Sequence, residues 1–254
     1  MESVLARTKA YEEKIVKLIL IKDGTYDLEE DLIIKCPISI HGAGQNKTIL
    51  QRHGIQIEGP KKEKKRVNMQ GMTMKGSSGH GLWARNGLSF LCKDMTFTQC
   101  RFSGVYAQYT KGRLINCVIT QSGCSGIRCH KNALIELEGS QTKVHGNGYR
   151  PLEDFGDYGL QTIYMSSIIH LLFPLTKESV STNNHGGRNY NSNGTIETVN
   201  PYKKKKGRKG RRNIEVTISK VCQSNQTIVY AGTVLIYSYI PKDAATTRAT
   251  NSFQ

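Results

Sequence analysis

An eleven-residue phrase that ends on glycine recurs four times in the middle of this 254-residue chain. The copies read GMTMKGSSGHG, DMTFTQCRFSG, NCVITQSGCSG and EGSQTKVHGNG, and they close on Gly81, Gly104, Gly126 and Gly148. The closing glycines are 23, 22 and 22 residues apart. Repeats of this length are single supersecondary units that bury their apolar side only by stacking on one another. The phrase therefore predicts a solenoid.

Apolar and polar residues alternate within each unit with a period of two, which is the pattern of short β-strands. Glycine, asparagine and aspartate occupy the expected corners because they tolerate positive φ. Aligning the phrases gives three apolar columns: Met72, Met95 and Cys117; Met74, Phe97 and Ile119; and, after the closing glycines, Leu82, Val105, Ile127 and Tyr149. The residues expected to point outward between them are Thr73, Thr96, Val118 and Ser140. These columns predict a parallel β-helix whose equivalent residues lie over one another.

The segment before the repeats, DGTYDLEEDLIIKCPISIHGAGQNKTIL, has an Asp-Gly-x-Tyr opening, an apolar strand and a Gly-x-Gly before Thr-Ile-Leu. With these features, residues 22–148 resemble the right-handed parallel β-helix superfamily, often called pectin-lyase-like. The resemblance implies an all-β, right-handed parallel β-helix solenoid. It leaves function open, because the superfamily includes polysaccharide lyases and hydrolases, viral and phage spike proteins, and non-catalytic recognition modules.

The remaining sequence divides the chain into five parts. An amphipathic N-terminal segment predicts a helix that leads into a strand and caps the first coil. After the β-helix, a segment rich in Asn, Ser and Gly has two interpretations, a polar and basic loop or further irregular coils. Alternating residues after it predict strands, for which an antiparallel cap is one arrangement. The predicted parts are 1–21 (cap), 22–175 (β-helix), 176–212 (loop or irregular coils), 213–240 (C-terminal strands) and 241–254 (tail).

The net charge of +16 is concentrated in two short runs, residues 61–66 and 203–212, which supply 12 of the 16 charges. Such runs are typical of nuclear localisation signals. They also predict salt-dependent, sequence-independent contact with nucleic acid or another polyanion. The cations concerned are Lys61, Lys62, Lys64, Lys65, Arg66, Lys203, Lys204, Lys205, Lys206, Arg208, Lys209, Arg211 and Arg212.

Seven cysteines without a secretory signal predict reduced thiols and an intracellular location, with the nucleus indicated by the basic runs. No apolar run approaches the roughly 20 residues that span a bilayer, so no membrane contact is expected. The alternative to free thiols is a metal site formed by Cys124, Cys129 and His130. The chain has no paired C-x-x-C, and neither a metal nor a cofactor is predicted.

Two features bear on catalysis. Gly79-His80-Gly81 matches a Gly-His-Gly motif of the polygalacturonase-like members, but their Asn-Thr-Asp, Asp-Asp and Arg-Ile-Lys motifs are missing. Asp94, Asn116 and Glu138 open successive phrases and form one partly acidic column, at a corner where such residues serve turn geometry. A turn role is the preferred interpretation. A divergent polysaccharide lyase or glycoside hydrolase remains the alternative.

The outward column after the closing glycines is the candidate recognition face. It holds Trp83, Tyr106, Arg128 and Arg150, with Arg85 and His130 beside it. Aromatic rings and guanidinium groups on a flat face hold sugar rings, bases or peptides by stacking and cation–π contacts. The alternative is that these side chains pack on one another or under a loop.

Together these features predict a non-catalytic β-helix binding or scaffold protein. Its basic segments would contact nucleic acid or another polyanion. The outward face of its β-helix would contact a protein or a glycan. A divergent polysaccharide-active enzyme and a structural virion protein are the two alternatives.

Overall fold

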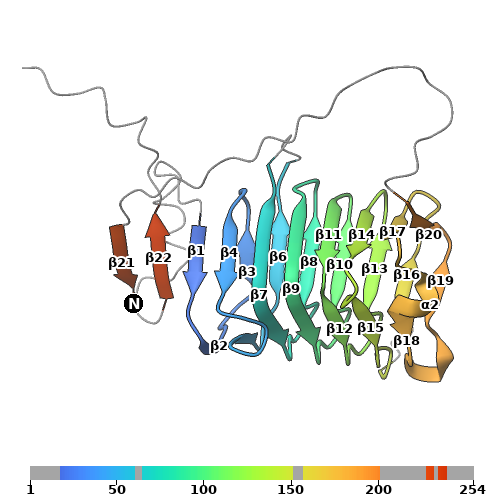
Figure 1. The fold of residues 1–254 in the computed structure, drawn as a ribbon, viewed down its shortest axis with the longest axis horizontal. Helices are drawn as coiled ribbons and strands as arrows, with labels where there is room; N and C mark the ends of the chain where they lie inside the picture. The colour runs from blue at the N-terminus through green and yellow to red at the C-terminus, as the bar shows by residue number, and fades with distance from the viewer. Residues whose placement is uncertain (1–17, 61–64, 151–156, 201–226, 232–233, 239–254) are drawn as a thin grey trace, which may run out of the picture.

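The computed structural model describes residues 18–60, 65–150 and 157–200, and the backbone of residues 227–231 and 234–238. The strands form a parallel β-solenoid of about 7 turns (Figure 1). This confirms the predicted all-β, parallel β-helix architecture. Several predicted parts lie outside the described residues: the amphipathic segment 1–17, the basic run 203–212, residues 213–226 of the C-terminal strands and the tail 241–254.

Each coil contributes strands to three faces, which we number in chain order. The first face is a seven-stranded sheet of β3 (Leu32–Ile34), β6 (Ile55–Glu58), β8 (Leu82–Arg85), β10 (Val105–Gln108), β13 (Ile127–His130), β16 (Leu160–Thr162) and β19 (Tyr190–Ser192). The second face holds β1 (Leu18–Ile21), β4 (Ser39–Gly42), β7 (Val67–Lys75), β9 (Phe90–Thr98), β11 (Lys111–Ile115), β14 (Leu134–Glu138), β17 (Ile168–Leu172) and β20 (Thr195–Val199).

The long strands β7 and β9 continue around the next corner, so their second halves belong to the third face. The other strands of this face are β2 (Gly24–Asp27), β5 (Thr48–Gln51), β12 (Val118–Thr120), β15 (Lys143–His145) and β18 (Ser181–Thr182). Neighbouring strands within each face are parallel, so every backbone ladder runs along the solenoid axis. The chain therefore stacks coil on coil, as the repeat length predicts.

Stacked inward side chains fill the interior. Leu82, Val105 and Ile127 are paired in register and fully buried. Met74, Phe97 and Ile119 form a second buried column in register. A glycine is required where a ring crosses the interior: a Cβ on Gly112 would lie 2.1 Å from Cζ of Phe90. The predicted columns of the first three repeats are confirmed.

The corner between the second and third faces explains why Asp and Asn recur there. Gly71, Asp94, Asn116 and Gly139 occupy it with φ of 64°, 49°, 51° and 87°. This is the left-handed region, which glycine and asparagine tolerate best. The turn role predicted for Asp94 and Asn116 is confirmed. Glu138 was misplaced in that column, since it pairs with Ile115 inside β14 and Gly139 takes the corner.

The fourth repeat is shifted from the predicted alignment. Val118 lies opposite Lys143 instead of Ser140, a shift of three residues. One extra residue precedes Gly139, since Ile115 already pairs with Glu138, and a turn closed by the Thr142 N–H and the Gly139 carbonyl adds the other two. Ile127 then pairs with Leu160, so the prediction that Tyr149 continues its column is wrong. The physical reason is an insertion between Gly148 and Gly159, which delays the next strand of the first face.

The solenoid is longer than predicted at both described ends. β1 already pairs in parallel with β4, so Leu18–Ile21 belongs to the stack. At the other end, α2 (Lys177–Val180), β18, the 3-10 turn η1 (His185–Gly187), β19 and β20 complete a further coil. Of the two interpretations of 176–212, irregular coils describe residues 176–200.

The C-terminal strands β21 (Thr227–Ala231) and β22 (Val234–Ser238) pair with each other in antiparallel fashion. β22 also pairs antiparallel with β1, next to the first coils in Figure 1. The predicted C-terminal strands are therefore present over these residues. Within the described residues, no helix has the length and apolar character needed to cross a membrane.

Candidate functional site

Three members of the predicted recognition column lie side by side on the first face. Trp83 on β8, Tyr106 on β10 and Arg128 on β13 are in register and point outward. The indole and phenol rings are stacked, with centroids 6.3 Å apart and planes 13° apart. Cζ of Arg128 lies 5.7 Å from the Tyr106 ring. These side chains pack on one another, as the alternative interpretation of the column expects.

Arg85 completes the stack from the neighbouring outward column. Its Cζ lies 4.4 Å from the centroid of the Trp83 ring. Its Nη2 also donates a 2.6 Å hydrogen bond to the carboxylate of Glu58, on β6 of the preceding coil. This bond, with smaller contributions from Lys35 and Gln56, holds the pKa of Glu58 below its ordinary value despite some desolvation. The Arg85 charge is therefore balanced within the protein.

His130 extends the ring contacts toward the next corner. Its Nδ1 lies 3.3 Å from the Tyr106 hydroxyl, and its ring meets the edge of Tyr164 at 4.7 Å. Burial lowers the pKa of His130, and the charges of Lys131 and Arg128 lower it further. The imidazole is therefore mostly neutral at pH 7 and takes part as a ring.

His80 and Phe102 belong to the same cluster, although sequence reasoning did not place them on this face. The His80 ring lies 4.9 Å from Tyr106 and 5.4 Å from Phe102. Desolvation by burial, followed by the Arg128 charge, lowers the pKa of His80 to about 4. Its Nδ1 accepts a 3.2 Å hydrogen bond from the Ser103 N–H. A half-buried, neutral imidazole held by these contacts packs within the cluster.

Arg150 does not join the predicted column, because the insertion places Gln161 beside Arg128. The Arg150 N–H donates a 2.8 Å hydrogen bond to the Gly123 carbonyl, at the corner between the third and first faces. Its guanidinium lies 5.7 Å from the Tyr149 ring. Arg150 is thus an exposed corner residue beside the face.

A second group of side chains was missed by sequence reasoning. Tyr109, Lys131 and Tyr164 occupy successive coils at the corner between the first and second faces. Tyr109 and Tyr164 are both 47% exposed, and Lys131 Nζ lies 6.0 Å from the Tyr109 ring. We call these three residues the tyrosine–lysine corner. Tyr109 and Lys131 each directly follow the last outward residue of a strand, and this position was the only available signal for them.

The basic segments are only partly described. Lys65 and Arg66 are exposed before β7, and Nε of Arg66 donates a 2.9 Å hydrogen bond to Asn68. The other predicted cations, Lys61, Lys62, Lys64 and those of 203–212, lie outside the described residues. Their role stays a prediction.

The carboxylates considered for catalysis occupy different positions in their coils. Glu138 lies on the second face and forms a 2.8 Å ion pair with Arg113. The Arg113 guanidinium also approaches the Glu136 carboxylate. Asp94 lies at the next corner, beside a shallow cavity of about 490 Å³. The residues lining this cavity include one other charged side chain, Lys47, and no second carboxylate. An acid and base pair around a glycosidic bond requires two carboxylates, which this cavity does not offer.

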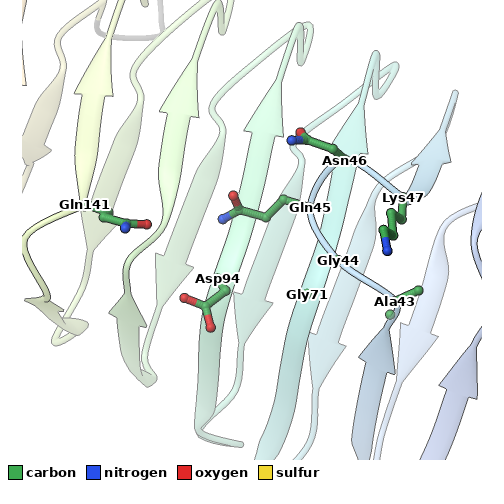
Figure 2. A pocket seen from close by; sticks show the side chains of 9 residues that line it. Ala43, Gly44, Gln45, Asn46, Lys47, Gly71, Asp94 and Gln141 are labelled. Atoms are coloured by element: carbon green, nitrogen blue, oxygen red, sulfur yellow. The ribbon is translucent and has the colours of Figure 1, made fainter.

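The same cavity shows how one loop crosses several coils. Figure 2 shows that residues 43–47 form a loop over the corner. Asp94 and Gln141, which also line the cavity, belong to later coils. Gln45 Nε2 donates to the carbonyl of Asn116 at 3.4 Å, and the Gln45 carbonyl accepts from the Thr73 hydroxyl at 2.6 Å. The loop is thereby fastened to two further coils.

The described residues contain no cluster of three His, Cys, Asp or Glu side chains able to hold a metal ion. The alternative metal site is divided by the sheet itself: Cys129 is buried inside the solenoid, whereas His130 points outward. Cys124 is also buried. The free cysteines on inward columns, including Cys92 and Cys117, behave as small apolar residues, and burial raises their pKa.

No protein-family model matches the sequence, and comparisons with curated proteins and with solved structures find no similar chain. The chain is a parallel β-solenoid with a packed aromatic and guanidinium cluster on one face.

Proposed function

We propose that this chain is a non-catalytic binding or scaffold protein of the right-handed parallel β-helix, pectin-lyase-like kind, which contacts a polyanion through its basic runs. The observation that carries the proposal is the distribution of charge. On the solenoid, Arg52, Arg85, Arg113 and Arg188 each lie in an ion pair with a carboxylate. The two runs hold 12 of the 16 net charges. The excess positive charge is thus concentrated in the runs.

Ten residues with eight cations favour a polymer of phosphates as the partner. Each phosphate that such a segment neutralises releases condensed counterions, which gives salt-dependent affinity without sequence preference. Nucleic acid is therefore the partner class that the charge distribution supports best. A rigid solenoid with basic segments attached to it would act as a scaffold on that polymer.

The proposal is tested by salt elution from immobilised heparin and from immobilised DNA. Replacing Lys203–Lys206 by glutamine should move elution to clearly lower salt. The matched control replaces four exposed lysines of the solenoid, Lys47, Lys75, Lys93 and Lys143, which removes the same charge. Equal elution shifts for the two variants would show that only net charge matters. Absence of retention of the unaltered protein would overturn the proposal.

The run at 203–212 also supports nuclear targeting as a second function of the same segment. A fusion of residues 200–213 to a fluorescent reporter should accumulate in the nucleus. The control is the same fusion with its lysines and arginines replaced by glutamine. Equal distribution of the two fusions between nucleus and cytoplasm would rule out nuclear targeting by this run.

A further inference from the structure

The tyrosine–lysine corner has a repeating chemistry along the solenoid axis. Tyr109, Lys131 and Tyr164 follow Gln108, His130 and Ile163 in three successive coils. The backbone joins the first two coils here, because the Tyr109 N–H donates a 3.0 Å hydrogen bond to the Lys131 carbonyl. Strand spacing of about 4.8 Å places the two tyrosines roughly 10 Å apart with the lysine between them. The order along the axis is ring, cation, ring.

Both rings have surface available to a ligand. Tyr109 and Tyr164 are 47% exposed, and Met165 beside Tyr164 is 90% exposed. Tyr164 is supported from behind by His130, at 4.7 Å and nearly perpendicular. By contrast, Trp83 and Tyr106 are stacked on each other and on guanidinium groups. The exposed corner is therefore better suited to stacking than the packed column that the sequence indicates.

The charge at this corner is positive. The corner column formed by Asn86, Tyr109, Lys131 and Tyr164 contains no carboxylate. Lys131 Nζ already lies 6.0 Å from the Tyr109 ring, within cation–π range. A ligand that stacks on the ring and carries an anion next to it would satisfy both groups at once.

From this geometry we infer that the tyrosine–lysine corner binds single-stranded nucleic acid, with successive bases on Tyr109 and Tyr164 and the phosphate between them at Lys131. A single strand presents base, phosphate and base in the same order as the corner presents ring, cation and ring. Duplex bases are stacked inside the helix and cannot reach the tyrosines. This inference rests on the proposed function and narrows it to one form of polyanion.

The test uses the full chain and a fluorescein-labelled oligothymidine of about 12 nucleotides, within the range of known single-strand sites. Anisotropy titrations compare this probe with a duplex of the same length and with heparin. Tyr109→Ala and Tyr164→Ala should each weaken oligothymidine binding by about 5- to 150-fold, the usual effect of losing one base-stacking ring. Binding to heparin should change little. Lys131→Gln should make the salt dependence for the single strand shallower by about 0.7.

The control variant is Tyr190→Ala. Tyr190 is 40% exposed and has Lys177 Nζ 4.3 Å from its ring, but it lies on β19, outside the corner column. This variant should bind oligothymidine as the unaltered protein does. Thermal unfolding of every variant establishes that it is folded.

The outcomes separate the two proposals. Salt-dependent binding to all polyanions with unchanged affinity in Tyr109→Ala and Tyr164→Ala would overturn the corner site and leave the proposed function standing. Equal affinity for the single strand and the duplex would also overturn the corner site and leave the proposed function standing. Failure of the unaltered protein to bind any polyanion would overturn both.

Discussion

Asn147 is a fully buried polar residue whose side chain connects neighbouring coils at the corner between the third and first faces. Its Oδ1 accepts a hydrogen bond from the Ser122 N–H at 3.0 Å. Its Nδ2 donates to the Ile119 and His145 carbonyls and to Oδ1 of Asn184 in the following coil. Asn184, also buried, repeats the arrangement one coil further. These amides satisfy backbone groups that no water reaches.

Replacing Asn147 by alanine should lower the free energy of unfolding by about 3 kcal/mol, because it leaves several buried backbone groups without a partner. Urea denaturation followed by circular dichroism measures the change. Asn46→Ala, at an exposed loop position, should stay within about 0.5 kcal/mol of the unaltered protein. Similar small effects for both variants would contradict the role of the asparagine ladder.

His80 makes stability depend on pH. Its pKa is about 4 in the folded protein and 6.5 in the unfolded chain, so the unfolded chain binds more protons between these values. The contribution of the neutral His80 to the free energy of unfolding is fully present above pH 6.5 and is lost as the pH falls toward 4. Between pH 7.5 and pH 5 the loss amounts to about 2 kcal/mol.

The measurement is urea denaturation at pH 7.5 and at pH 5. His80→Asn keeps an acceptor for the Ser103 N–H and removes the titrating group, so its loss of stability over this range should be smaller by about 2 kcal/mol. An identical pH dependence in the two proteins would show that His80 is accessible to protons when folded.

At the scale of the elements, the left-handed corners decide where strands end. Asp94 has φ of 49° within the bent strand β9, a conformation in which a Cβ costs about 1–2 kcal/mol. Asp94→Gly should therefore leave the free energy of unfolding unchanged or raise it slightly, and Asp94→Ala should lower it by about 1 kcal/mol. Thermal unfolding compares the two. Equal stability of the glycine and alanine variants would mean that the corner is not left-handed.

These corners also explain how much of the fold the sequence predicts. Coils that turn at Gly71, Asp94 and Asn116 are of nearly equal length, so aligning phrases at those residues places the strands correctly. The fourth phrase fails because a Gly139–Thr142 turn and the insertion after Gly148 add residues at corners. Additions at a corner leave the alternation within strands intact and change only the spacing. The Gly159-Leu160 pair, which repeats the Gly-apolar junction, is the signal for the true register.

The site is less predictable than the fold. Outward positions of strands follow from alternation, so Trp83, Tyr106 and Arg128 could be identified on one face. Whether their rings are free or packed depends on side-chain conformation, which alternation does not report. Tyr109 and Tyr164 lie at corners, where coil length varies and equivalent positions cannot be aligned without the structure. The exposed part of the candidate site was therefore missed.

At the scale of the whole molecule, the register of the first face can be tested by cross-linking. Arg128 lies opposite Gln161 on the neighbouring strand, within the spacing that a disulfide spans. Oxidation of the Arg128→Cys, Gln161→Cys double variant should form that disulfide, detected by mass spectrometry of peptides. The matched control pairs Arg128→Cys with Arg150→Cys, as the unshifted repeat would place them. Preferential cross-linking of the control would contradict the structure.

The solenoid and its basic segments fit one physical account. Stacked coils supply a rigid support on which Arg52, Arg85, Arg113 and Arg188 are paired with carboxylates. The excess positive charge is concentrated in residues 61–66 and 203–212. A polyanion would be attracted by the segments and oriented on the solenoid by stacking at the tyrosine–lysine corner.

The most direct test of this account is the salt dependence of oligothymidine affinity, measured for the unaltered protein and for a variant whose eight cations in 203–212 are glutamine. Each phosphate contact with a single strand contributes about 0.7 to the slope of log affinity against log salt. We therefore expect a steep slope that becomes shallower by several units, at most about 6, in the variant. Equal slopes and equal affinities for the two proteins would contradict it.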